Sequence, residues 1–410
     1  MPTYLTPGIY IEEISTGAKP IEAVGTSTAA FVGIAPNADA RLQEAFAVNS
    51  WSQFTKEFIA EGNASTALSH AVFGFFQNSG SRCYVVNVGK NGSLTGDGKR
   101  RQGIELLEEI DEIAIVAAPG FTDTASYDAL LSHCENLKDR VAILDAPDDV
   151  ANVDQLKTVA SVEKPKRGAT PTEGDPSDSA PVPKGLRPRA SDGGYGAFYF
   201  PNLIVRDPLA PKSDPVLVPP SGHIAGIYAR TDATRGVHKA PANETVRGAL
   251  DLSYRITPAE QGELNTLGVN CIRFFPTQGI RVWGARTLAD SASEWRYVNV
   301  RRFFNMVEES IARGTRWVVF EPNDRSLWGA IKRDISAFLT LQWRQGALMG
   351  ATPEQAFFVQ CDEETNPPEV IDAGQVIAVI GIAPVKPAEF VIFRIGQSAG
   401  GTEVETQGEI

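Results

Sequence analysis

Ser221 and His223 are the residues of this chain whose types and spacing could perform nucleophilic catalysis. On a strand, two residues that are two apart share one face, which would bring a histidine base beside a serine nucleophile. A serine nucleophile usually lies on a sharp turn such as G-x-S-x-G, whereas here Pro219 and Pro220 directly precede Ser221 and give a different backbone. A cytoplasmic α/β serine hydrolase that uses Ser221 and His223 is therefore kept only as the alternative hypothesis.

The other motifs that could bind a cofactor or a metal depart from the spacing that such sites need. Residues 92–99 are rich in glycine and end in a lysine, but they miss the P-loop spacing, and Arg100 stands where a Mg²⁺-binding hydroxyl is needed. The four histidines include no H-x-x-x-H pair and the four cysteines no C-x-x-C pair. We therefore expect no catalytic residue, no cofactor and no metal site, and cysteines that are reduced and mostly buried.

A charged cluster lies among small residues in the segment 218–243. Small residues let two backbones approach closely, so we expect these charges to form an ion-pair network that fixes a loop or joins subunits. The other interpretation is an exposed loop whose charges are merely solvated. The members of the cluster are Arg230, Asp232, Arg235 and Lys239.

Length and composition indicate a globular protein of two or three domains. The chain has 410 residues, of which 42% are hydrophobic and 21% charged. Its formal net charge of −12 argues against a general nucleic-acid binder, which would normally carry a basic domain. The N-terminus lacks the pattern of a secretory signal, and the longest apolar run, 376–385, is interrupted by glycine and proline. We expect a chain that is made and folded in the cytoplasm.

Strands and helices alternate through the first half of the chain, which predicts a largely parallel sheet covered on both faces. The expected strands are 27–34, 82–88, 112–118, 141–145, 195–200 and 203–206, and the expected helices include 68–76, 126–138 and 153–162. We expect the last two of these strands to return the chain to the sheet. The intervening segment 164–194 is rich in Pro, Ser, Asp and Gly, which predicts a mobile surface loop.

The last hundred residues predict a compact α+β domain. An apolar stripe from Val300 to Ile311 at helical spacing is stopped by Gly314, and Asp324 is a plausible N-cap for a helix that runs through Gln345. The segments expected to form strands are 316–320, 376–380 and 389–395.

Both ends of the chain contain strand-forming segments that we expect to need another strand to pair with. Three prolines exclude a helix in residues 1–22, and the strand-forming residues 8–14 cannot fold alone. An apolar strand at 389–395 would leave an open edge, for which an extended N-terminal arm is a natural donor.

Several ordered segments resemble the tail sheath proteins of contractile phage tails and related injection machines, and together they span nearly the whole chain except the Pro-rich segment 164–194. These segments are YLTPGIYIEE (4–13), TSTAAFVG (26–33), FFQNSGSRCYVV (75–86), the charged segment 218–243, LNTLGVN (264–270), VWGARTL (282–288), VNVRR (298–302), VFEPN (319–323) and PAEFVI (387–392).

The resemblance implies a multi-domain α/β plus α+β fold. It implies a central, largely parallel α/β domain at 23–290, subtilisin-like without an active site, with the insertion 164–194. A C-terminal α+β domain at 291–386 and arms at 1–22 and 387–410 complete the chain. The arms are expected to add strands to a sheet in neighbouring subunits through Tyr4, Pro7, Gly8, Ile9, Tyr10 and Ile11 at one end and Phe390, Val391, Ile392 and Phe393 at the other.

The resemblance also implies the function and the partners. Subunits would polymerise as stacked hexameric rings around an inner tube and contract to drive the tube through a target envelope. With no nucleotide site, the energy would be stored at assembly. The partners would be other copies of the chain, the inner tube protein, and baseplate and terminator or cap proteins, with no nucleic acid and no direct membrane insertion.

The particle would be a phage tail or a contractile injection device assembled in the cytoplasm. The exposed cations of helix 324–345, Lys332, Arg333 and Arg344, are expected to face the inner tube through weak, salt-sensitive ion pairs, unless they form an ordinary solvated face. A tube or baseplate subunit is a further possibility, but the resemblance across both arms and the middle domain does not favour it.

Overall fold

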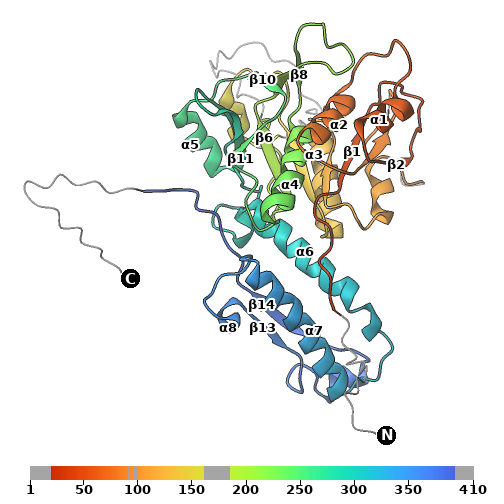
Figure 1. The fold of residues 1–410 in the computed structure, drawn as a ribbon, viewed down its shortest axis with the longest axis vertical. Coiled ribbons are helices and arrows are strands. Elements are labelled where there is room, and N and C mark those ends of the chain that lie inside the picture. The colour runs from red at the N-terminus through yellow and green to blue at the C-terminus, as the bar shows by residue number, and fades with distance from the viewer. Residues whose placement is uncertain (1–19, 91, 97–99, 161–184, 393–410) are drawn as a thin grey trace, which may run out of the picture.

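The computed structural model describes residues 20–90, 92–96, 100–160 and 185–392. In Figure 1 these residues form a large α/β unit at the top and a small unit at the bottom, and the long helix α6 (Val298–Gly314) leads from one to the other. The predicted N-terminal arm, up to residue 19, and the chain beyond Ile392 lie outside the described residues.

A nine-stranded sheet organises the large unit, in the order β2-β3-β1-β4-β5-β6-β11-β12-β9. Its six central strands, from β3 to β11, run parallel to their neighbours, and β2, β12 and β9 join antiparallel at the edges. The predicted parallel-dominated α/β sheet is therefore confirmed. The strands are β1 (Ala29–Gly33), β2 (Ala45–Val48), β3 (Cys83–Asn87), β4 (Ile115–Ala117), β5 (Val141–Asp145), β6 (Gly196–Phe200), β9 (Glu244–Thr245), β11 (Val269–Phe275) and β12 (Gly279–Val282).

Helices cover both faces of this sheet, because parallel strands are apolar on both sides. One core joins the sheet to α2 (Ala67–Gln77) and α4 (Ser221–Arg235), and a second core joins the opposite face to α3 (Thr124–Leu137) and α5 (Pro258–Thr266). Helices α2 and α4 approach closely: a Cβ on Gly222 would lie 2.2 Å from the Cα of Ala71. The remaining helical elements here are α1 (Trp51–Phe58), η1 (Ile104–Glu109), η2 (Val153–Lys157) and η3 (Glu294–Arg296).

Two expectations about the middle of the chain are wrong, and a third is wrong for residues 185–194 alone. Strand β7 (Leu203–Val205) pairs with β8 (Val216–Val218) and β10 (Ala249–Leu252) in a separate three-stranded sheet, because both sides of β6 are already taken by β5 and β11.

The second error concerns the predicted helix 153–162, which is only the short 3-10 helix η2, since the chain then pairs with residues near Arg187. The third concerns the predicted mobile loop. Residues 185–194 are held in place, with the N–H of Ala160 donating to the carbonyl of Arg187 at 2.7 Å and Ser191 buried. Residues 161–184 of that prediction lie outside the described residues.

The small unit packs two long helices against a two-stranded sheet. Helix α7 (Arg325–Arg344) begins where predicted, since the Asp324 carboxylate accepts a hydrogen bond from the Leu327 N–H at 2.9 Å. Strand β13 (Phe357–Gln360) pairs antiparallel with β14 (Val379–Ile382), which begins three residues later than the predicted strand 376–380. Short helices η4 (Arg316–Val318), α8 (Pro353–Ala356) and α9 (Pro368–Asp372) complete the unit.

The strand predicted at 316–320 is wrong. Its first residues form η4, and Trp317 and Val318 pack against the helical core rather than joining a sheet. Phe320 is fully exposed with a φ of 70°, in a region that is unfavourable for a bulky side chain. The apolar character of the segment therefore reflects core packing at its start and an exposed loop at its end.

Candidate subunit-linking site

The structure does not arrange Ser221 and His223 as a nucleophile and its base. Ser221 begins helix α4 instead of lying on a strand, and its N–H and Oγ donate to the two carboxylate oxygens of Asp145 at 2.7 and 2.6 Å. Both residues are fully buried, and burial raises the pKa of Asp145 to about 7 against the effect of the Ser221 hydrogen bonds. The geometry does not support the hydrolase alternative, because the hydroxyl is directed to a carboxylate and is closed to solvent.

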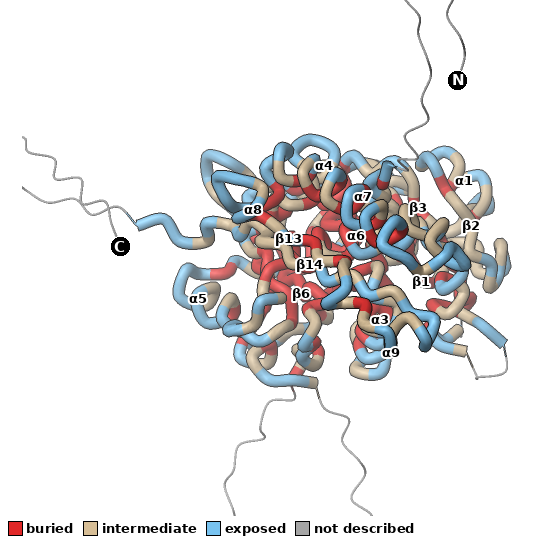
Figure 2. The backbone as a smooth tube through the Cα atoms, turned by 90° about the horizontal axis from the view of Figure 1, so that it is seen from below, coloured by how far each residue is buried: buried red, intermediate tan, exposed pale blue. Residues whose placement is uncertain are grey.

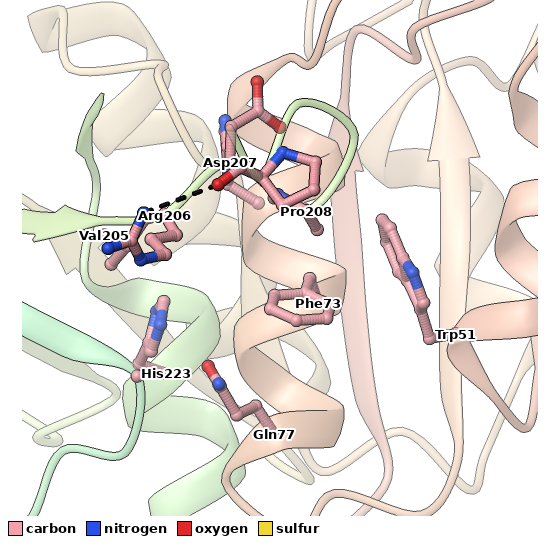
Figure 3. A pocket seen from close by; sticks show the side chains of 11 residues that line it. Trp51, Phe73, Gln77, Val205, Arg206, Asp207, Pro208 and His223 are labelled. Atoms are coloured by element: carbon pink, nitrogen blue, oxygen red, sulfur yellow. Dashed lines mark hydrogen bonds between the residues drawn. The ribbon is translucent and has the colours of Figure 1, made fainter. Parts of the chain in front are cut away.

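His223 lines a cavity of about 280 Å³ together with Trp51, His70 and Phe73 (Figure 3). Both of its ring nitrogens are buried and without a hydrogen-bond partner among the described residues. Burial, with the nearby His70, lowers the pKa of His223 to about 4, so the ring is neutral at pH 7.

Metal ligands are also not gathered into a site. Within residues 20–90, 92–96, 100–160 and 185–392, no group of three or more His, Cys, Asp or Glu residues could hold a metal ion. The four cysteines are free and buried, as expected from the sequence.

The four residues of the predicted charged cluster lie on α4 and just after it, but they bond to other partners. Asp232 pairs with Arg302 on α6, and Arg230 donates to the carbonyl of Thr245 at 2.7 Å and lies 3.5 Å from Glu244. Lys239 donates to a neighbouring backbone carbonyl, and Arg235 is exposed. The cluster therefore joins α4 to other segments rather than forming a network of its own. Arg302, the partner of Asp232, was missed from the sequence.

The first described residues of the chain are anchored on α6, and we call residues 21–26 the N-terminal root. Ile21 is buried in the core of the small unit, and the N–H of Val24 donates to the Ser310 hydroxyl at 3.0 Å. At Thr26 the hydroxyl donates to Asp232 at 2.6 Å, while its carbonyl accepts from Arg302 at 2.9 Å.

The Arg302–Asp232 pair at this root is almost fully buried. Two guanidinium nitrogens of Arg302 bond to the two carboxylate oxygens at 3.0 and 2.6 Å, and the side chains are 3% and 6% exposed. The guanidinium carbon also lies 4.6 Å from the centre of the Tyr228 ring. The N-terminal root is thus built into the junction between the two units.

The other end of the chain is anchored at Glu389, and we call Glu389 with its three partners the C-terminal root. Arg286 donates to both carboxylate oxygens at 2.9 and 2.8 Å, Asn265 donates to one at 2.6 Å, and the Tyr297 hydroxyl donates to the other at 3.0 Å. Burial raises the pKa of Glu389, but the hydrogen bonds and charge of Arg286 and the other donors outweigh it, and the net pKa is lowered.

Beyond Glu389 the chain leaves the body and is exposed, as Figure 2 shows. Phe390, Val391 and Ile392 are 71%, 68% and 80% exposed. The strand predicted at 389–395 does not form over residues 389–392 of the single chain, because nothing in the described part pairs with it. Phe393 lies outside the described residues, as do all six arm residues predicted near the N-terminus.

The sheet of the small unit has unpaired edges that could accept an added strand. It contains only β13 and β14 within the described ranges. The N–H of Ala383 donates to the carbonyl of Ala356, so the alternation of an antiparallel pair turns the backbone groups of Ile380 and Ile382 away from β13. Val379 is 43% exposed on this strand. An exposed edge of this kind is a template for another chain.

The three predicted tube-facing cations lie on the solvent-exposed side of α7. Arg333 bonds to the buried Asp334 at 3.1 Å. For Lys332 and Arg344, no ion pair is found with any residue in the described part of the chain. The charges of Lys332 and Arg344 are thus available for ion pairs with another protein.

Two domain families match the chain: the phage tail sheath protein central domain over residues 102–288 and the phage tail sheath C-terminal domain over residues 290–398. The chain belongs to the tail sheath family. This result confirms the resemblance drawn from the ordered segments.

Known sheath proteins resemble the chain in sequence and in structure. The tail sheath protein of Vibrio phage KVP40 is 32% identical over 177 residues, which are 42% of this chain and 26% of that protein. The contracted sheath of an extracellular contractile injection system, PVC, is 29% identical with a TM-score of 0.73 and covers 97% of this chain and 99% of its own. The contracted helical sheath of the anti-feeding prophage is 31% identical, with a TM-score of 0.71, over 97% of this chain and 100% of its own.

These comparisons identify the chain as a structural subunit of a contractile sheath, part of a phage tail or contractile injection particle. The matched segments span only 26–45% of the length of the curated relatives. The subtilisin-like description of the central domain remains unconfirmed. Among the described residues, no helix has the length and apolarity to cross a bilayer.

Proposed function

We propose that this chain polymerises as stacked hexameric rings around an inner tube and contracts to drive that tube through a target envelope. The rings form because each subunit offers a donor at one place and an acceptor at another. Such a contact is heterologous, and it generates a ring or a helical filament rather than a closed dimer. The contracted helical sheath of the anti-feeding prophage, similar over its whole length, supports this arrangement.

The observation that carries the proposal is the pairing of an exposed apolar segment with an unpaired sheet edge on the same chain. Residues 390–392 leave the body as exposed apolar residues, while Ile380 and Ile382 direct backbone groups outward from β14. Roughly five added backbone hydrogen bonds at about 1 kcal/mol each would contribute about 5 kcal/mol per arm before the ordering entropy. Repeated around a ring, such links keep subunits joined while they move.

Each subunit is then a rigid body between two arms, residues 1–22 and 387–410, with a central domain at 23–290 and a C-terminal domain at 291–386. The proposal includes no nucleotide-binding site, so the energy for contraction is stored when the sheath assembles in the cytoplasm. The extended sheath is therefore metastable. The partners are neighbouring copies, an inner tube protein, and baseplate and cap proteins. A similar chain in the baseplate of the anti-feeding prophage, 32% identical with a TM-score of 0.71, supports the baseplate contact.

Electron microscopy of the purified chain, with and without residues 1–22, tests the proposal. Long striated tubes or stacked rings that are lost on deletion would support a sheath linked by its arms. Uniform monomers in both samples, also in the presence of the inner tube protein as a template, would contradict the proposal.

The proposed contact with the inner tube predicts an effect of charge on α7. Lys332→Glu with Arg333→Glu should weaken co-assembly with the tube, and most strongly at low salt, because ion pairs between exposed charges are screened. Arg325→Glu is a matched control at the start of the same helix, since Arg325 already pairs with Glu363. Unchanged tube co-assembly in the double variant would contradict this contact.

A further inference from the structure

The first and the last described segments of the chain are anchored in different units of the subunit. Residue Ile21 at the N-terminal root packs in the core of the small unit, which is built from the last third of the chain. After β14, in contrast, the chain leaves the small unit and returns to the large unit, where Glu389 bonds to Arg286 and Asn265. In Figure 1 the C-terminal segment accordingly leaves at the level of the junction, and not from the bottom of the small unit.

We infer that Glu389 is a positioning residue that fixes the point and the direction from which the C-terminal arm leaves the subunit. This inference rests on the proposed linking function of the arm. Four hydrogen bonds converge on one carboxylate, while the residues that follow are exposed. Glu389 is therefore the last anchored residue before the exposed part of the arm.

The partner of Glu389 is itself held rigidly. The backbone N–H of Arg286 donates to the Asn270 side chain at 2.7 Å, and its carbonyl accepts from the same side chain at 2.7 Å. Asn270 is fully buried on β11, a strand of the large sheet. The guanidinium also donates to the carbonyl of Asn265 at 3.1 Å. Through Arg286, Glu389 is therefore linked by hydrogen bonds to the main sheet at Asn270.

The groove beside the root supports the same direction of exit. A surface groove of about 490 Å³ is lined by residues of the large unit, including Trp283 and Pro258, and by Phe390 and Val391 of the departing arm. Phe390 and Val391 thus lie against the large unit even though they are mostly exposed.

Loss of the Glu389 contacts would lengthen the arm and move its origin. The preceding residue held by backbone hydrogen bonds is Val385, whose N–H donates to Ala347 and whose carbonyl accepts from Asn299. Release of Glu389 would free residues 386–389, about 13 Å of extended chain, in addition to the exposed residues that follow. A longer and less directed arm samples more positions that do not reach an acceptor edge. Binding of the arm to a neighbouring subunit then has a larger entropy cost.

Distance measurements between two spin labels in the isolated subunit test this inference. One label is placed at Ile392→Cys on the arm and one at Ala337→Cys on the exposed side of α7. The four native cysteines are buried, which directs labelling to the two new thiols. We expect a narrow distance distribution in this background and loss of the narrow component in Glu389→Gln.

Two further variants make the result specific. Glu263→Gln makes the same change at an exposed residue of the neighbouring helix α5 and should keep the narrow distribution. Tyr297→Phe removes only one hydrogen bond from Glu389 and should cause an intermediate broadening, which remains measurable if Glu389→Gln does not fold.

An unchanged narrow distribution in both Glu389→Gln and Tyr297→Phe would overturn the positioning role. The readout does not depend on polymerisation, so the two hypotheses can fail separately. If the labelled background chain never forms tubes but Glu389→Gln still broadens its distance distribution, only the proposed function is refuted. Tubes that form equally well with a released Glu389 would refute the need for positioning.

Discussion

The N-terminal and C-terminal roots use the same chemistry in different surroundings. Each is centred on an arginine that forms a bidentate ion pair, with two hydrogen bonds, to a carboxylate. The Arg302–Asp232 pair lies inside the junction between the two units, whereas the Arg286–Glu389 pair lies at the surface, where Glu389 is 19% exposed. The N-terminal root is therefore part of the fold, and the C-terminal root only directs an arm.

The largest expected effect is the loss of stability when the buried pair at the N-terminal root is broken. Arg302→Met leaves the Asp232 carboxylate buried without its main partner, so we expect a loss of about 3–5 kcal/mol in the free energy of unfolding. Urea denaturation of the variant and the unaltered chain measures this loss of unfolding free energy. Arg325→Met, at a mostly exposed arginine, should change stability by less than about 1 kcal/mol. Equal effects at the two positions would contradict the distinction between a buried and an exposed pair.

A second contrast compares one apolar residue at each end of the described chain. Ile21→Ala should cost about 3 kcal/mol, because Ile21 is buried against Gly314 in the core of the small unit. Ile392→Ala should leave the unfolding free energy unchanged, since Ile392 is 80% exposed, and should weaken only assembly. Thermal unfolding of the two variants checks both statements. A destabilised Ile392→Ala would show that the arm folds onto its own body.

Acid should affect the body before it affects the C-terminal root. The pKa of His223 is lowered from 6.5 to about 4, so the unfolded state binds a proton between these values and the folded state does not. The contribution of His223 should therefore lower stability by up to about 3 kcal/mol as the pH decreases from 6.5 to 4. The buried Asp145, whose pKa is raised to about 7, should act in the opposite direction over the same range. Glu389 has a lowered pKa, so its ionised contacts are lost only when the pH falls below the ordinary range of a glutamate.

Denaturation curves at several pH values measure this effect, and His223→Leu supplies the comparison. As the pH falls from 6.5 to 4, the stability of the unaltered chain should decrease relative to that of the variant by up to about 3 kcal/mol. The same slope in both would show that other groups, such as the buried His133 with a pKa of about 4, dominate the acid response.

Local patterns predicted the elements, but not the contacts that join them. The spacing of apolar residues and the Asp324 cap predicted α7 because these signals act within a few residues. The Arg286–Glu389 and Arg302–Asp232 pairs connect residues 103 and 70 positions apart, and no local pattern marks such partners. At 316–320, β-branched and aromatic residues suggested a strand, but the tertiary packing of Trp317 and Val318 overrides that propensity.

One missed element did carry a usable signal. Proline is well tolerated at the start of a helix, so Pro219 and Pro220 before Ser221 are consistent with the beginning of α4. That reading would have placed Ser221 at a helix terminus and not on a strand. Its buried partner Asp145, at the end of β5, lies 76 positions away and was not predictable in the same way.

The most direct test of the account is a disulfide cross-link between the arm of one subunit and the sheet edge of another. Ile392→Cys and Val379→Cys are placed in one chain, whose native cysteines are buried. Oxidation of the assembled particles should produce a ladder of covalent multimers, which either single variant should not produce. Particles that assemble normally but yield no ladder, both with this pair and with Tyr10→Cys in place of Ile392→Cys, would contradict linkage of subunits through strands added at β14.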